Sequence, residues 1–165
     1  MAIIKTLTID GFYQPYEATR IYNVVSNLTN YEEREFGTEL RNFNMIPEGA
    51  NELFSKVLGR KVEVTEEQSG VFRYPKLFVH FEGFDQVEEW IFVVALELTT
   101  FNVFRHLSGA KTALDGYNFD YRNLLEWDIG VNYQLEPGQG VFFRPWLFHG
   151  FDGGLVQIFR LRETP

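Results

Sequence analysis

The sequence predicts a mainly β, α+β fold in which two N-terminal helices precede a barrel or sandwich of short strands. Three observations predict it. Aromatic residues make up 17% of the 165 residues, with 17 Phe and 8 Tyr, and such side chains favour strands and bury large areas. From Lys61 onward, short apolar segments alternate with turn residues. Before Lys61, apolar residues recur at helical spacing instead.

The length of the chain predicts one domain. A protein of 165 residues and 19.3 kDa is large enough for its own hydrophobic core and too small for two comfortable ones. We therefore predict a single domain, 1–165, in which an N-terminal strand and helices (1–60) precede a β-barrel core (61–165). The helices are expected to pack on the outside of the barrel.

Composition and charge exclude several classes of protein. No apolar run approaches the roughly 20 residues of a membrane span, and the first residues do not resemble a signal peptide, so we expect a soluble, cytoplasmic protein without membrane contacts. The absence of cysteine excludes disulfides and thiolate ligands, so a metal must be held by His, Asp, Glu or water. A net charge of −8 argues against nonspecific nucleic-acid binding, which depends on Lys and Arg.

The first 60 residues predict two strands and two helices. Residues 2–12 alternate apolar and polar side chains in their second half, as a strand does. Pro15 suits the first turn of a helix, and the apolar residues that follow it recur at helical spacing. Residues 31–46 mix apolar and charged side chains and predict a strand. Pro47 suits the start of a second helix, which Gly59 ends.

The rest of the chain predicts a succession of short strands separated by turns. Gly-containing dipeptides such as Ser108-Gly109 and Pro137-Gly138 mark the turns. The predicted strands are 61–66, 70–74, 76–82, 90–97, 99–106, 124–128, 131–135, 140–145 and 155–162. Many short strands at this spacing are typical of an all-β sandwich or barrel.

A histidine and a carboxylate lie two residues apart in one of these strands. The chain has only three histidines, His80, His106 and His149. Because side chains alternate along a strand, His80 and Glu82 project from the same face. Together they can supply two ligands to a divalent metal. An isolated pair of this kind is more often a histidine at the rim of a sheet beside a solvated carboxylate.

The third histidine follows a turn and a strand near the C-terminus. Pro137-Gly138 makes a tight turn, and the strand that follows ends at Pro145, which has no N–H to donate to a neighbouring strand. The chain then presents His149 on the next turn. This order places His149 just beyond the end of a strand.

Two arginines end the last predicted strand. Arg160 and Arg162 share a face with the apolar Val156 and Ile158. If that face lines the barrel interior, a buried guanidinium needs an anion, and a carboxylate matches its fork of donors. If it faces outward, the two arginines are surface charges.

These C-terminal residues resemble a known family. The run Pro-Gly-x-Gly-Val-x-Phe-x-Pro-x-x-x-His, from Pro137 to His149, is followed eleven residues later by Arg160. It resembles the C-terminal half of the double-stranded β-helix, a jelly-roll, cupin-like barrel, of the Fe(II)/2-oxoglutarate-dependent oxygenases. The resemblance implies a facial triad in which His80, Glu82 and His149 hold Fe(II), leaving sites open for 2-oxoglutarate and oxygen. It implies that Arg160 binds the far carboxylate of 2-oxoglutarate.

An upstream segment extends the resemblance to the prolyl-hydroxylase branch of that family. Phe72-Arg73-Tyr74-Pro75 precedes His80 as an Arg/Tyr-containing strand precedes the metal motif in that branch. The resemblance implies that Tyr74 contacts 2-oxoglutarate. The implied activity is hydroxylation of an unidentified small-molecule or peptide substrate, with Fe(II) and 2-oxoglutarate as cofactor and co-substrate and no catalytic residue beyond the metal ligands.

Two departures from the family pattern concern the metal site. The carboxylate is Glu82, where aspartate is far commoner, and its extra methylene changes the distance from the strand to the metal. The Gly-Gly-x-Leu strand of the family is absent, and residues 99–106 take its place. In a cupin-type site, His106 could replace Glu82 as a ligand; more commonly such a residue is a hydrogen-bonded strand histidine.

Other residues near the motifs are alternates for binding roles. Arg144 is the alternative anion anchor if Arg160 points outward, and Arg162 is a further one. Trp146 lies three residues before His149 and could form a pocket wall, although large aromatic residues usually fill a core.

Two other functions compete with the oxygenase interpretation. One is a non-catalytic cupin-like binding or assembly domain, which exposed aromatic residues would favour. The other is a cupin metalloenzyme that does not use 2-oxoglutarate. The interpretations separate on whether His80, Glu82 and His149 converge on a point about 2 Å from each. A homodimer is left open by the sequence.

Overall fold

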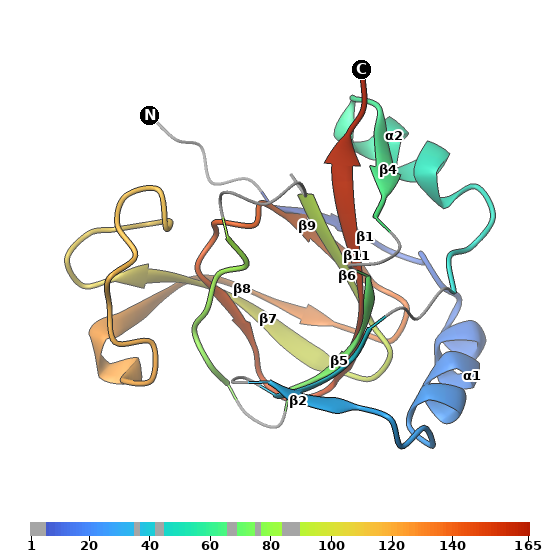
Figure 1. Cartoon of the computed structure of the whole chain (residues 1–165), viewed down its shortest axis with the longest axis horizontal. Helices are drawn as coiled ribbons and strands as arrows, with labels where there is room; N and C mark the ends of the chain where they lie inside the picture. Colours follow the sequence, from blue (N-terminus) through green and yellow to red (C-terminus); the bar gives the residue numbers. More distant parts are fainter. Residues whose placement is uncertain (1–5, 35–36, 42–44, 66–68, 75–76, 84–89) are drawn as a thin grey trace.

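The computed structural model describes residues 6–34, 37–41, 45–65, 69–74, 77–83 and 90–165 (Figure 1). In this part of the chain, antiparallel strands form two sheets and two α-helices lie outside them, as the sequence predicts. No helix of the described residues is long and apolar enough to cross a membrane. Both helices precede β4 (Val62–Val64).

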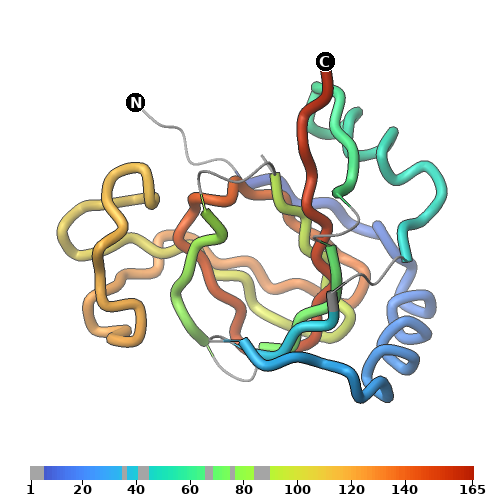
Figure 2. The backbone as a smooth tube through the Cα atoms, viewed as in Figure 1, coloured from blue at the N-terminus to red at the C-terminus, as the bar shows by residue number. Residues whose placement is uncertain are grey.

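The larger sheet has the order β1-β9-β6-β11-β5-β3-β2, and β4 pairs with the end of β11. Its strands are β1 (Leu7–Ile9), β9 (Gly140–Phe143), β6 (Trp90–Ala95), β11 (Leu155–Glu163), β5 (Gly70–Arg73), β3 (Gly37–Arg41) and β2 (Glu32–Arg34). The smaller sheet is β10 (His149–Phe151), β7 (Thr99–His106) and β8 (Trp127–Leu135). Figure 2 shows the two sheets curving around a common interior.

Alternation along the strands divides the core into two main clusters. In β6, Ile91 and Val93 belong to the interior cluster between the sheets, whereas Phe92 and Val94 belong to the outer cluster beneath the helices. Strands buried on both faces read as continuous apolar runs, and every residue of β6 is buried. The interior cluster consists of Phe72, Tyr74, Ile91, Val93, Ala95, Phe101, Val103, Leu135, Val141, Phe143, Leu147, Phe151, Val156 and Ile158.

The two helices cover the outer face of the larger sheet (Figure 1). Helix α1 (Pro15–Val25) begins with proline in its first turn, and a capping box joins Gln14 to Glu17. Helix α2 (Ala50–Leu58) ends at Gly59, which has φ +70° and closes the helix as a left-handed cap. Both helices fall where the sequence predicts them.

Three predicted elements differ in the structure. Residues 31–46 were expected to form one strand, but the described part forms two paired strands, β2 and β3; residues 42–44 lie outside the described residues. The predicted strands 124–128 and 131–135 are a 3-10 turn followed by the single strand β8, because Gly130 is accommodated as an irregularity in the register with β7 and the pairing continues on both sides of it. His149 begins β10 instead of lying on a turn.

The predicted strand over 76–82 is also wrong. In its described part, 77–82, only His80 forms a bridge, and its partner is His149. Beyond that bridge, the N–H groups of Glu82 and Gly83 both donate to the carbonyl of Pro145, at 2.7 and 3.2 Å. Proline has no N–H to donate in return, so a regular ladder cannot continue there.

The outer cluster predicts a large penalty for removing one ring of α2. Phe54 is fully buried and its ring contacts those of Phe12, Phe92 and Phe159. We expect Phe54→Ala to lower the free energy of unfolding by about 3–5 kcal/mol, since it leaves a cavity that the rigid sheet cannot fill. Urea denaturation measures the loss.

The matched control is the neighbouring Leu53→Ala on the exposed face of the same helix. It should cost about 0.5 kcal/mol or less. Equal losses for the two variants would contradict the packing described.

Candidate metal centre

His80, Glu82 and His149 converge at one end of the barrel interior. One ligand atom from each lies within 4.8 Å of the others. The backbones of His80 and His149 exchange two hydrogen bonds, each 2.9 Å long, and their ring centroids are 4.2 Å apart. This reciprocal bridge places two residues that are 69 positions apart in the sequence side by side.

A single carboxylate oxygen faces both imidazole rings. Glu82 Oε1 lies 3.4 Å from Nε2 of His80 and 3.6 Å from Nε2 of His149. His149 is completely buried and His80 is 8% exposed. Two imidazole nitrogens and one carboxylate oxygen that point at a common centre are the donor set of a 2-His-1-carboxylate site.

The tautomer of His149 suits a metal ligand. Its Nδ1 lies 2.8 Å from the carbonyl oxygen of Leu147, which can only accept, so Nδ1 carries the proton. Nε2 therefore presents its lone pair toward the other two groups, and this buried atom has no hydrogen-bond partner among the described residues. A hydrogen bond on the far nitrogen orients a metal-bound histidine in the same way. The residues present thus fit a divalent metal.

Burial and charge shift the protonation of these groups. Burial lowers the pKa of His149, as does the nearby His80, and the Glu82 carboxylate opposes this only in part. Burial by itself raises the pKa of Glu82, but the Arg160 guanidinium first and then the two nearby histidines outweigh it and hold that pKa well below its usual range. The site therefore presents a neutral imidazole and an ionised carboxylate, the forms that bind a metal.

Arg160 lies beside the three candidate ligands. Its Nη1 is 3.2 Å from Glu82 Oε2, and the residue is 7% exposed. Alternation along β11 sets Arg160 on the same face as Val156 and Ile158, which belong to the interior cluster. Of the two positions that the sequence left open for Arg160, the structure shows the interior one, where its guanidinium contacts a protein carboxylate.

A cavity of about 200 Å³ adjoins the site. Arg160, His80 and Glu82 line it together with Tyr74, whose ring stacks on that of His80 at 5.9 Å. The full lining is Arg34, Glu39, Phe72, Tyr74, His80, Phe81, Glu82, Ile158 and Arg160. Burial and the Glu82 charge raise the pKa of Tyr74 well above its usual range, so its hydroxyl stays protonated.

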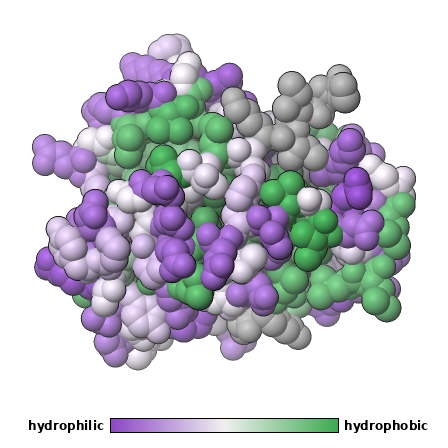
Figure 3. All heavy atoms as spheres, turned by 180° about the vertical axis from the view of Figure 1, so that it is seen from behind, coloured by the Kyte–Doolittle hydropathy of each residue, from purple (hydrophilic) through white to green (hydrophobic). Residues whose placement is uncertain are grey.

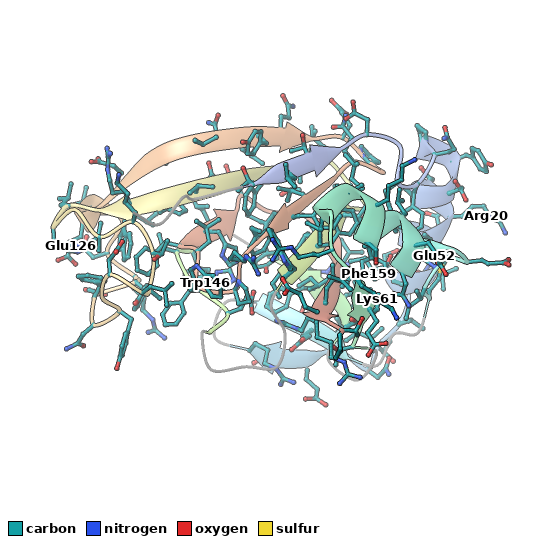
Figure 4. All side chains as sticks on the ribbon, turned by 90° about the horizontal axis from the view of Figure 1, so that it is seen from above. Arg20, Glu52, Lys61, Glu126, Trp146 and Phe159 are labelled. Carbon is teal, nitrogen blue, oxygen red and sulfur yellow. The ribbon has the colours of Figure 1, made fainter. Side chains whose placement is uncertain are left out.

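The alternates for anion binding lie outside this cavity. Arg144 stacks on Trp90, with its guanidinium carbon 3.7 Å from the ring centroid, and Arg162 pairs with the exposed Glu63 at 2.6 Å. Trp146 packs against a separate aromatic cluster around Trp127. Figure 4 shows Trp146 toward the end of the molecule that carries Glu126.

His106 does not join the candidate ligands. Its Nδ1 lies 3.1 Å from the backbone N–H of Ser108, and its ring stacks on Phe119 with centroids 3.9 Å apart. The interpretation of His106 as a hydrogen-bonded strand residue is the one that fits this geometry. Among the described residues, the metal-ligand cluster contains Glu82 and not His106.

Sequence reasoning missed two charged residues of the cavity. Glu39, on β3, is 4% exposed and accepts a hydrogen bond from Nε of Arg34 at 3.0 Å. The preceding run Glu32-Glu33-Arg34-Glu35 reads as a solvated face, yet Arg34 lines the cavity. Alternation was the available signal, since Leu40 packs in the outer cluster and its neighbour Glu39 must face the other way.

Comparison with solved structures identifies the fold. HygX from Streptomyces hygroscopicus, with nickel, 2-oxoglutarate and hygromycin B bound, has a TM-score of 0.63 at 12% identity over 98% of this chain and 83% of that one. A 2OG-Fe(II) oxygenase family oxidoreductase from Burkholderia pseudomallei has a TM-score of 0.61 at 10% identity, covering 95% and 84%. The chain has the 2OG-Fe(II) oxygenase fold.

A Pseudomonas putida prolyl-4-hydroxylase also shares the oxygenase fold, with a TM-score of 0.50 at 9% identity over 98% of this chain and 94% of that one. No protein-family model matches the sequence, and a search of curated proteins finds no match. The double-stranded β-helix inferred from the C-terminal motif is thereby confirmed as the fold of this chain.

Burial of neutral His149 predicts a pH-dependent stability of the metal-free protein. Folding lowers the pKa of His149, so below its ordinary value of about 6.5 the unfolded chain binds more protons than the folded one. The free energy of unfolding should therefore fall as the pH drops from 7 to 5. Glu82 should add a further loss below about pH 4.5, as the pH falls toward its lowered pKa.

Urea denaturation at a series of pH values, with a chelator present, measures this dependence. His149→Gln should flatten the slope between pH 7 and 5. An unchanged slope in His149→Gln would show that His149 is not the group responsible.

Proposed function

We propose that this chain is an Fe(II)- and 2-oxoglutarate-dependent dioxygenase that hydroxylates a small-molecule or peptide substrate. The observation that carries the proposal is the convergence of His80, Glu82 and His149 beside a buried arginine on the 2OG-Fe(II) oxygenase fold. HygX, a structural neighbour, has been solved with nickel and 2-oxoglutarate bound, which supports the same pair of ligands here.

Each residue of the site has a distinct part in this proposal. His80, Glu82 and His149 would hold the metal through two imidazole nitrogens and one carboxylate oxygen. Fe(II), when bound, would activate oxygen as the oxidant, with 2-oxoglutarate as the co-substrate. Arg160 binds the far carboxylate of 2-oxoglutarate, because a guanidinium matches a carboxylate with two parallel hydrogen bonds. Tyr74, with its hydroxyl protonated, donates to the same ligand.

Aromatic rings line part of the cavity and pack behind the metal ligands. Phe72 and Tyr74 line the cavity, and their ring centroids are 4.4 Å apart. Behind the metal ligands, Phe143 packs on His149 with centroids 4.4 Å apart. Such apolar walls strengthen the interactions of the charged groups, because they lower the local dielectric constant.

The structure favours the oxygenase over a purely structural binding domain. Such a domain should expose many aromatic residues, but Tyr16 and Tyr117 are the only exposed aromatics among the described residues. Figure 3 shows polar side chains interspersed with apolar patches on the rear face. The many phenylalanines instead fill the clusters of the core.

One observation favours a second candidate, a metalloprotein on the same barrel that does not use 2-oxoglutarate. The proposed anchor, Arg160, is already paired with Glu82. If that ion pair persisted with metal bound, the far carboxylate of 2-oxoglutarate would lack its principal partner. The two candidates therefore differ in whether the co-substrate binds, and not in whether the metal does.

An anaerobic titration tests the proposed cofactors. Fe(II) followed by 2-oxoglutarate should produce a visible charge-transfer band that requires both additions. His149→Ala removes one of three ligands and should weaken Fe(II) binding by more than about 100-fold, abolishing the band. His106→Ala is the matched control and should retain the band, since His106 lies outside the cluster.

Each outcome decides between the candidates. A band in the wild type that His149→Ala loses supports the dioxygenase. Metal binding without any response to 2-oxoglutarate supports the second candidate. Absence of metal binding, measured also as thermal stabilisation by Mn(II), would overturn both.

A further inference from the structure

The two oxygens of Glu82 face different partners. Oε1 lies between the two histidine Nε2 atoms, at 3.4 and 3.6 Å, whereas Oε2 lies 3.2 Å from Nη1 of Arg160. The carboxylate that would hold the metal is thus also the carboxylate that neutralises the anion anchor. The contact with Arg160 uses one of the two oxygens of the Glu82 carboxylate and at least one of the five N–H donors of the guanidinium.

The pair is well shielded from solvent. Arg160 and Glu82 have side chains that are 9% and 15% exposed, and Arg160 is on β11 while Glu82 follows the bridge to β10 in the facing sheet. Bulk water screens such a contact less than it screens a surface ion pair. A ligand that takes the guanidinium must therefore compete with a partner that is already in place.

A second protein carboxylate lines the same cavity. Glu39 is buried and pairs with Arg34 at 3.0 Å, and both line the cavity with Glu82 and Arg160. Among the described residues, the lining therefore contains two carboxylates and two guanidinium groups, and their charges balance. A dicarboxylate that enters the cavity can pair with a guanidinium group only if that group leaves its present carboxylate partner.

We infer that Glu82 competes internally for Arg160, closing the anion site of the metal-free protein to a small dicarboxylate. The inference deepens the proposed function and rests on it, because the dicarboxylate in question is the co-substrate. A divalent cation on Oε1 draws charge away from Glu82 and weakens its attraction for the guanidinium. Metal binding would thereby loosen the ion pair between Glu82 and Arg160 and free the guanidinium for the dicarboxylate.

The test uses metal-free protein and glutarate, a five-carbon dicarboxylate that lacks the keto group needed to chelate a metal. Isothermal titration should show weak binding to the wild type and about tenfold tighter binding to Glu82→Gln, since hydrogen bonds to charged groups are worth at least this factor. The amide keeps the length of the side chain but removes the charge that holds Arg160. An affinity equal to that of the wild type would overturn the inference.

The matched control is Glu63→Gln, which removes the carboxylate partner of the exposed Arg162 on the same strand. It should leave glutarate binding unchanged. Glu82→Gln combined with Arg160→Ala should lose the gain, which shows that the added affinity passes through the guanidinium. A gain that survives in the double variant would also overturn the inference.

A second variant covers the case in which Glu82→Gln does not fold, since it leaves Arg160 buried without an anion. Glu82→Asp keeps the charge but withdraws the carboxylate by about 1.5 Å, the length of one carbon–carbon bond. It should also bind glutarate more tightly than the wild type, and no gain would overturn the inference.

Failure of the proposed function gives a different result. If the wild type binds no Fe(II) while Glu82→Gln gains affinity for glutarate, the oxygenase proposal fails and the competition for Arg160 stands. If the wild type binds Fe(II) and 2-oxoglutarate while neither Glu82 variant gains affinity for glutarate, the competition fails and the oxygenase proposal stands.

Discussion

The buried charge of Glu82 is the constraint on which the site depends. An ionised carboxylate removed from water requires partners of opposite charge or strong hydrogen-bond donors, and loss of one partner is costly. Here Arg160 comes from the larger sheet, whereas His149 comes from the smaller one. The same carboxylate therefore connects the two sheets and collects the groups that could bind a metal and an anion.

Hydrogen bonds of the backbone fix the positions of the two histidines more firmly than side-chain contacts alone could. The reciprocal bridge between His80 and His149 sets the separation of the imidazoles, and the Leu147 carbonyl fixes which nitrogen of His149 faces the site. Gly150 allows this approach, because a Cβ there would lie 1.9 Å from the Phe78 carbonyl oxygen. The helices contribute only indirectly, by burying the far side of the sheet that carries Arg160.

Much of this architecture could be predicted from the sequence. Period-2 apolar segments and capped helices located most elements, and the motif from Pro137 to His149 predicted the fold. The three candidate ligands and Arg160 were predicted as well, and the structure brings them together. Pairing between distant segments could not be predicted, because it depends on which backbone groups meet: in its described part, the predicted 76–82 strand is reduced to one bridge between His80 and His149, and Pro145 prevents the pairing from continuing. Glu39 was missed because charged segments of this kind are usually exposed to solvent, whereas Glu39 is buried.

The central claim is that Glu82, which pairs with Arg160 in the metal-free protein, forms a metal site with His80 and His149. Anomalous diffraction from an anaerobically grown crystal with Mn(II) tests it most directly. The account predicts a single manganese peak about 2 Å from Glu82 Oε1 and from Nε2 of His80 and His149, the usual length of such metal–ligand bonds. A manganese peak held by other residues, or no manganese peak at all, would contradict it.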